Sequence, residues 1–310
     1  MSPALTLAFA LLASAPEPTT PASTDSARGG DEFKTVVRPR DTTPPTAVLD
    51  RARLEETAGR DLATLLDDEP GMDVTRLGGL GAFATLSIRG SSPEQVLLAL
   101  DGIPLNPADG APVDLSTLPL GPLDHVDLYR GRSPWALGVT GLGGAVLLHS
   151  RRAPERVAAD AELATGSFGT GVLRAWVGGG GLSLAIDGLT TRSNFRFTND
   201  QGTAWTTEDD RLVTRANADS SSATILARAE LDLDPGRLTL LDAWTTVDRG
   251  LPGLGVNPTR ESRFSKERHL HAQRRDHEPA PFRRPNTTRL APTATEVPDP
   301  LGEIGLGSGP

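Results

Sequence analysis

The chain has 310 residues, of which 37% are hydrophobic, and it carries a formal net charge of -9 at pH 7. This hydrophobic content is enough to bury a core, which excludes a wholly disordered chain. The negative charge argues against nucleic acid as a partner, since binding to phosphates needs a surplus of Lys and Arg, and the absence of cysteine excludes disulfides and thiolate metal sites.

The chain begins with a short apolar stretch, residues 1–15, that is too short to span a bilayer. Leu5–Leu12 supplies an apolar region and Ala13-Ser14-Ala15 gives the pattern of small residues that signal peptidase needs, although the usual preceding Lys or Arg is missing. We predict a signal peptide here, with a disordered N-terminus as the alternative. Since no later stretch has the roughly 20 apolar residues of a transmembrane helix, any membrane span must use β-strands.

Residues 16–47 are predicted to form a flexible tether, because Pro, Ser, Thr and Ala dominate Pro16–Gly30. Inside this tether lies one short run with β-branched residues, an isolated strand of the kind that adds to the edge of a partner's sheet. The run consists of Glu32, Phe33, Lys34, Thr35, Val36, Val37 and Arg38.

Residues 48–152 have the pattern of a compact α/β domain. Leu62, Leu65 and Leu66 share one helical face, and Pro70-Gly71 ends that helix. Turn residues, among them Asp101-Gly102, then separate short apolar runs. These runs are Ala84–Ile88, Val96–Leu100, Val126–Tyr129 and Ala145–Leu148. We expect a small mixed sheet with one or two short helices.

Residues 153–266 alternate between apolar and polar side chains, as β-strands with two different faces do. Ile225, Ala227 and Ala229 alternate with Thr224 and Arg228, for example. Tight turns and long polar loops also alternate, which is typical of outer-membrane β-barrels, with a soluble antiparallel sheet as the alternative. The predicted fold class is therefore an α+β domain followed by antiparallel strands of an incomplete transmembrane β-barrel.

Beyond about Lys266 the regular alternation of side chains is lost. Residues 267–310 are rich in Arg, His, Pro and Thr, a composition that is typical of unfolded sequence. We expect an irregular tail here, either disordered or translated out of frame.

Several stretches of residues 48–152 closely resemble, in order and spacing, the motifs of the plug domain of TonB-dependent receptors. The successive motifs are Arg89-Gly90, Leu100-Asp101-Gly102-Ile103-Pro104-Leu105-Asn106, Asp114–Leu120, and the closing motif His125–Gly131 with Gly143-Gly144-Ala145-Val146. Motifs in register over about a hundred residues are more specific than a single glycine pattern.

The resemblance continues on both sides of the plug. Gly166–Thr170 looks like the first hairpin tip of siderophore and vitamin B12 receptors, Phe195–Asp200 looks like one of their early loops, and Glu32–Arg38 is similar in position to the TonB box. The family implies a plug inside a barrel of about 22 strands in the outer membrane of a Gram-negative bacterium. Its function is the uptake of scarce nutrients, here of the iron-siderophore or cobalamin class.

The same resemblance implies the partners. A TonB-type energy-transducing protein would pull on Glu32–Arg38, the barrel-assembly machinery would insert the strands, and a small-molecule nutrient would be the ligand. Arginines at the positions of Arg89 and Arg130 pair with barrel glutamates in the family and lock the plug in place; solvated turn arginines are the alternative. The other residues of the motifs are expected to be structural, and Gly90, Gly102, Gly131 and Gly144 to serve backbone geometry, with ligand contact as the alternative. The structural residues are Gly90, Asp101, Gly102, Gly131, Gly143 and Gly144.

No catalytic, cofactor or metal site is predicted, and we do not expect an enzyme, because the sequence has no nucleophile–base–orienter set. Two groups of residues that could ligate a metal are not interpreted as metal sites. The acidic loop fits a solvated surface better than a calcium site, and the histidines of the expected tail lack a ligand pattern. These residues are Asp200, Glu208, Asp209 and Asp210 in the loop, and His269, His271 and His277 in the tail.

The number of predicted strands departs from the family. At roughly 9 to 11 residues for each membrane strand, residues 153–266 hold about five strands, far fewer than about 22. We therefore expect a truncated, nonfunctional fragment of an outer-membrane transporter, located in the periplasm if the truncation is real. The alternative is a separate periplasmic plug module that binds ligand or TonB in a signalling role.

Overall fold

The computed structural model describes residues 44–56, 61–131, 134, 141–203, 205–234, 236–254, 257–276, 286–290 and 293–296. Met1–Arg40 and Asp41–Pro310 form two separate units. The predicted signal peptide and residues 16–43 of the tether lie outside the described residues. Among the helices described, none is long and apolar enough to cross a membrane.

The first domain of this unit contains a mixed sheet with the strand order β1-β6-β7-β4-β5. Its strands are β1 (Ala47–Leu49), β4 (Val96–Leu100), β5 (Ile103–Pro104), β6 (Leu123–Tyr129) and β7 (Gly144–Ser150). β4 and β7 run parallel, and the other neighbours run antiparallel. The predicted small mixed sheet is thereby confirmed.

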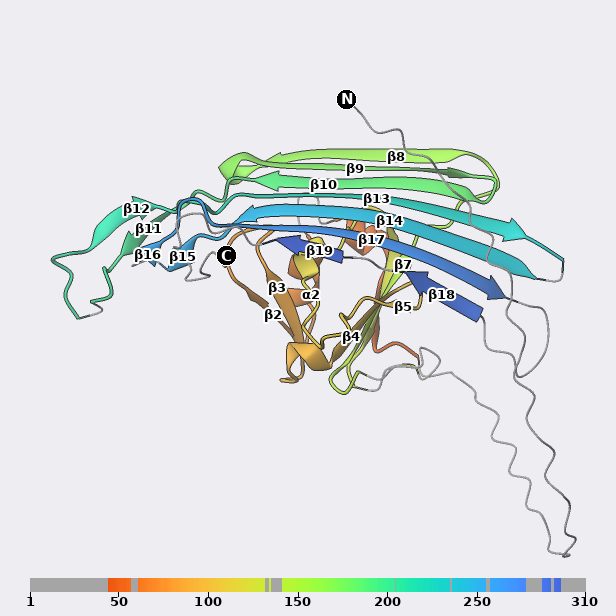
Figure 1. Ribbon diagram of the computed structural model, residues 1–310, viewed down its shortest axis with the longest axis horizontal. Helices are drawn as coiled ribbons and strands as arrows, with labels where there is room; N and C mark the ends of the chain where they lie inside the picture. The colour runs from red at the N-terminus through yellow and green to blue at the C-terminus, as the bar shows by residue number, and fades with distance from the viewer. Residues whose placement is uncertain are drawn as a thin grey trace, which may run out of the picture. The chain divides into compact units, whose positions relative to one another are not determined.

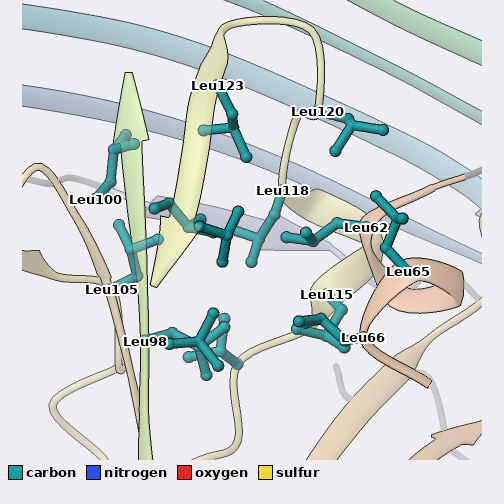
Figure 2. Close-up of a cluster of buried hydrophobic side chains, with 14 of the residues drawn as sticks. Leu62, Leu65, Leu66, Leu98, Leu100, Leu105, Leu115, Leu118, Leu120 and Leu123 are labelled. Carbon is teal, nitrogen blue, oxygen red and sulfur yellow. The ribbon is translucent and has the colours of Figure 1, made fainter. Parts of the chain in front are cut away.

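Short helices and a hairpin complete this domain. They are α1 (Arg51–Glu55), α2 (Leu62–Asp67), two 3-10 turns (Pro93–Gln95 and Leu115–Thr117), and the hairpin of β2 (Met72–Arg76) with β3 (Ala84–Ile88). Helix α2 begins at Asp61, whose carboxylate accepts a hydrogen bond from the backbone N–H of Thr64 (3.0 Å), as N-cap residues do. Its leucines are fully buried and meet those of β4, β6 and the connecting loop in one core (Figure 2).

Long antiparallel strands follow and lie side by side in one sheet (Figure 1). In chain order they are β8 (Ala158–Gly166), β9 (Thr170–Gly179), β10 (Leu182–Thr191), β13 (Ser220–Asp232), β14 (Arg237–Gly250), β17 (Arg263–Asp276), β18 (Asn286–Leu290) and β19 (Thr293–Glu296). Short turns follow β9 and β13, whereas the long connections after β10 and β14 contain small hairpins. These hairpins are β11 (Arg196–Asn199) with β12 (Arg211–Thr214), and β15 (Gly253–Leu254) with β16 (Asn257–Pro258).

The long strands place apolar side chains outward, whereas their inner face carries buried polar and charged side chains beside buried apolar ones such as Leu226 and Ala243. On β13, Thr224 and Arg228 are buried while Ile225 is 40% exposed. The same outward apolar face continues on neighbouring strands, as the exposed leucines and valine show: Leu163, Leu173, Val177, Leu182 and Leu184. A soluble sheet would place polar side chains on its outer face, so the outward apolar side chains favour a lipid-facing surface. The described strands form an open sheet that ends at β8 and β18, and the predicted antiparallel barrel strands are confirmed.

The prediction that strand structure stops near Lys266 is wrong. Strand β17 runs from Arg263 to Asp276 and pairs with β14 along its whole length; β18 and β19 then pair with β17. The pattern of β17 was hidden because its outward positions are polar, while its inward positions combine the charged Lys266 and Arg268 with the apolar Leu270 and Ala272. His269 and His271 face outward and contact Asp242 of β14 at 2.8 and 3.1 Å, so hydropathy shows no period of two. His277 lies outside the described residues.

Strand order predicts which backbone amides are best protected. β6, β7 and β4 each have two neighbours, whereas β1 and β5 lie at the edges. We expect the amides of Val96–Leu100 and Val126–Tyr129 to exchange among the slowest in hydrogen-exchange experiments, and those of β1 and β5 to exchange faster. Equal rates across the five strands would contradict this assignment.

A second prediction concerns Asp61 in acid. Arg76 contacts both carboxylate oxygens (2.7 and 2.8 Å). Burial by itself raises the pKa of Asp61, but hydrogen bonds and charge from Arg76 outweigh it and hold this pKa below its ordinary 3.8. The folded carboxyl group therefore binds a proton less readily than the unfolded one. The resulting stability is present above pH 3.8 and is lost as the pH falls through the folded pKa.

The test is Asp61→Asn, which retains an N-cap oxygen but removes the charge. Urea unfolding at pH 7 should show a loss of about 3 kcal/mol, as for other broken buried pairs, and the difference from wild type should shrink below about pH 4. Asp73→Asn, at an exposed carboxylate of β2, is the matched control and should change little. A loss that stays constant from pH 7 to pH 3 would rule out this interpretation.

Candidate functional site

The candidate site is the interface between the first domain and the inner face of the long strands. Arg228 of β13 forms an ion pair with Asp101 (2.8 Å) and donates a hydrogen bond to the hydroxyl of Ser150 (2.8 Å). Asp101 lies in the turn after β4, with a φ of 49°, and also accepts from the backbone N–H of Ser150 (3.0 Å). One buried arginine of the sheet thus joins two strands of the first domain.

A second arginine of the sheet forms a similar contact. Arg249 of β14 lies 2.8 Å from Asp114, and both side chains are only 5% exposed. Its guanidinium also donates to the hydroxyl of Ser116 (2.8 Å) and lies 4.3 Å from the ring centroid of Phe264. The Asp114 carboxylate accepts from the backbone N–H of Ser116 (3.1 Å), which fixes its orientation.

In the third contact the roles are exchanged, because the sheet supplies the carboxylate and the first domain supplies the hydrogen-bond donors. Asp187 of β10 accepts hydrogen bonds from the backbone N–H groups of Leu120 (3.2 Å) and Gly121 (2.7 Å). Arg174 of β9 lies 3.3 Å from Asp187. A Cβ at residue 121 would lie 3.2 Å from the Arg174 side chain and 3.0 Å from the Asp187 carboxylate, so glycine permits the close approach.

These contacts hold two domains together and contain no arrangement for acid–base or nucleophilic catalysis. A buried charge is costly unless its partner is present, whereas a pair of charges can separate and each can be hydrated again by water. Such an interface is therefore specific in position yet separable.

The two predicted lock arginines lie together but face the first domain. The side chains of Arg89 and Arg130 come within 3.8 Å of the position that a Cβ of Gly71 would occupy. Arg130 donates to the Glu69 carboxylate (3.1 Å), a residue of the same domain, while Arg89 is exposed. Among the described residues, Arg228 and Arg249 of the sheet form ion pairs with the first domain, whereas no such pair is seen for Arg89 or Arg130. The lock role of these two arginines therefore stays a prediction.

The motif glycines lie where the backbone needs them. Gly90, Gly102, Gly131 and Gly144 all have positive φ angles. A Cβ on Gly144 would overlap the carbonyl oxygen of Tyr129, and one on Gly143 would overlap the Ser91 side chain. Asp101 was predicted only as a turn residue, and its ion pair with Arg228 adds a second role.

Sequence reasoning missed most of the interface. Alternation correctly separated Arg228 from the apolar face of its strand, and the same alternation applied to β9, β10 and β14 would have found Arg174, Asp187 and Arg249. No local pattern, however, shows that Asp114 is their counterpart. The predicted coupling residues Glu32–Arg38 lie outside the described residues.

A family model described as TonB-dependent Receptor Plug Domain matches residues 38–145. The chain contains the plug domain of a TonB-dependent receptor. The long strands are part of the receptor's barrel, and the ion pairs above join plug to barrel. The predicted location, the outer membrane of a Gram-negative bacterium, is confirmed at the level of the family.

The relatives agree with this assignment. The vitamin B12 transporter BtuB of Vibrio vulnificus (strain CMCP6) is 29% identical over 147 residues, which cover 45% of this chain and 24% of the transporter. BtuB of Vibrio cholerae serotype O1 (strain M66-2) is 33% identical over 99 residues, covering 32% and 16%. The matched part thus spans about a quarter or less of these relatives. They are transporters, which supports the expectation that the protein is not an enzyme.

Solved structures show the same fold. The siderophore receptor PiuA from Acinetobacter baumannii has a TM-score of 0.55 at 17% identity, covering 82% of this chain and 37% of that one. The unliganded ferric citrate transporter FecA has a TM-score of 0.53 at 18% identity, covering 76% and 37%.

The plug–barrel ion pair of Asp114 generates a stability prediction. Asp114→Asn keeps the oxygen that accepts from Ser116 but leaves the charge of Arg249 buried and uncompensated. We expect a loss of about 3 to 5 kcal/mol in the free energy of unfolding, because a broken buried pair costs this much. Urea titration of the chain refolded in detergent micelles measures it.

Two further variants make this test specific. Asp232→Asn removes a carboxylate from an exposed pair with Arg237 and should cost less than about 1 kcal/mol. The double variant Asp114→Asn with Arg249→Met should regain most of the loss, since no buried charge remains. Equal losses for the two single variants would show that the buried pair does not hold the plug.

Proposed function

We propose that the receptor to which this plug belongs takes up a scarce nutrient of the iron-siderophore or cobalamin class across the outer membrane, driven by a TonB-type protein. The observation that carries the proposal is the buried but separable ionic interface between plug and barrel strands. The B12 transporters and the siderophore and citrate receptors among the relatives support the ligand class. The outward apolar face of the strands argues against the alternative of a separate periplasmic module.

Energy for this uptake would arrive as a mechanical pull. The coupling segment Glu32–Arg38 would add as a strand to the edge of a sheet in the energy-transducing protein, because backbone pairing demands little of the sequence. The tether leads from this segment directly to β1, so tension reaches the plug at Ala47. We propose that the barrel-assembly machinery inserts the strands, as in the family.

Strand β1 is the first strand of the plug that this tension would reach, and few backbone hydrogen bonds hold it. It has three residues, lies at the edge of the sheet and pairs with β6 alone. Two flanking bonds extend the pairing: the N–H of Thr46 donates to the carbonyl of Leu128 (2.7 Å), and the N–H of Arg130 donates to the Thr46 hydroxyl (3.1 Å). A short edge strand opens at lower free energy than a central one, so the pull would first separate β1 from β6.

The test deletes residues 33–38 from a full-length receptor that carries this plug. Binding of labelled cyanocobalamin and of a labelled ferric siderophore to whole cells should be unchanged, because the extracellular surface is intact. Energised uptake of the same probe should be lost, because the pull no longer reaches the plug.

A matched control deletes residues 20–25, the same length of tether outside the coupling segment. This variant should keep uptake, since a flexible tether tolerates a change of length. Equal uptake by the 33–38 deletion and the parent receptor would refute the coupling role.

A further inference from the structure

Two histidines and an aspartate of the plug lie together outside the interface with the barrel. His125 and Asp127 belong to β6 and His149 to β7, and one ligand atom from each lies within 4.8 Å of the other two. Val126 and Leu128, which alternate with the first two residues, are buried in the main core. The three polar side chains therefore lie on the opposite face of the sheet.

The pairing of the strands brings these side chains into register. His125 and His149 are direct partners across β6 and β7, just after a bulge in the ladder. Their rings stack with centroids 4.3 Å apart and an angle of 11° between planes. Nε2 of His149 lies 3.2 Å from a carboxylate oxygen of Asp127. Backbone geometry alone therefore presents two imidazoles and a carboxylate at one point.

The spacing suits a metal ion. Two ligand atoms at about 2.0 to 2.1 Å from a tetrahedral zinc ion are roughly 3.3 Å apart, close to the separation of the His149 and Asp127 atoms. The His125 ring lies nearly parallel to that of His149 and offers a third ligand atom within 4.8 Å of the other two. All three side chains are partly exposed, which leaves a path for an ion.

A fourth residue orients one of these ligands. Nδ1 of His125 lies 2.8 Å from a carboxylate oxygen of Asp124, which leaves Nε2 of that ring for the metal. A carboxylate behind a histidine is the usual outer shell of a metal site.

We propose that His125, Asp127 and His149 form a binding site for a divalent transition-metal ion of the zinc class, with Asp124 as a positioning residue. Two nitrogen donors and one oxygen donor suit zinc, nickel or copper and do not suit magnesium or calcium, which prefer oxygen alone. The site does not depend on the proposed uptake function. A bound ion would join β6 to β7 next to β1, and would stiffen this part of the sheet.

The test is a zinc titration of the 310-residue chain refolded in detergent micelles, followed by calorimetry and by competition with a coloured chelator. We expect one zinc ion per chain at this site, with magnesium unable to compete. His149→Gln removes a ligand and should lower the affinity about 100-fold or more, and Asp124→Asn should lower it about 10-fold or more through the orientation of His125. Because Asp124→Asn keeps all three ligands, it gives an answer even if the His149 variant folds poorly.

The matched control is His271→Gln, which removes a half-exposed histidine that also contacts an aspartate, Asp242 of β14. This variant should bind zinc like the parent chain. Zinc should also raise the urea midpoint of the parent and of His271→Gln, but not that of His149→Gln. Absence of stoichiometric binding in the parent, or an equal effect of the His149 and His271 substitutions, would overturn the proposal.

Discussion

The rest of the structure depends on arginines that the barrel strands bury on their inner face. Strands whose outer face is apolar must turn their polar side chains inward, and an inward arginine without a partner would be a costly buried charge. The plug supplies carboxylates at these positions, Asp101 for Arg228 and Asp114 for Arg249. Plug and strands are therefore complementary in charge, and the position of one determines the position of the other.

This complementarity constrains the loops of the plug as much as its strands. Asp101 reaches Arg228 only because the turn after β4 adopts a positive φ, and Asp187 reaches backbone N–H groups only because residue 121 has no side chain. The sequence motifs of the plug thus determine the backbone conformation of its loops. They bring charged groups and backbone donors to the surface that the barrel strands cover.

The sequence predicted the fold well wherever a local pattern determines it. Ala84–Ile88 and Val96–Leu100 coincide with β3 and β4 because turn residues bound each short apolar run. Strand β17 was not predicted because polar residues occur on both of its faces. Such a strand is specified by its neighbour β14 more than by its own composition. Only one side of the ionic interface could be predicted from the sequence. Alternation separates the two faces of a strand, but it says nothing about partners that are distant in the chain.

The length of β1 has a consequence for how the plug yields. A sheet under tension fails in an order set by its topology, and here the outermost strand offers three residue pairs before any central strand is loaded. The first step must also withdraw Leu49 of β1, which is buried in the main core. Substitutions at Val48, whose side chain is half exposed, would tune the sensitivity of the plug to force while leaving its resting architecture unchanged.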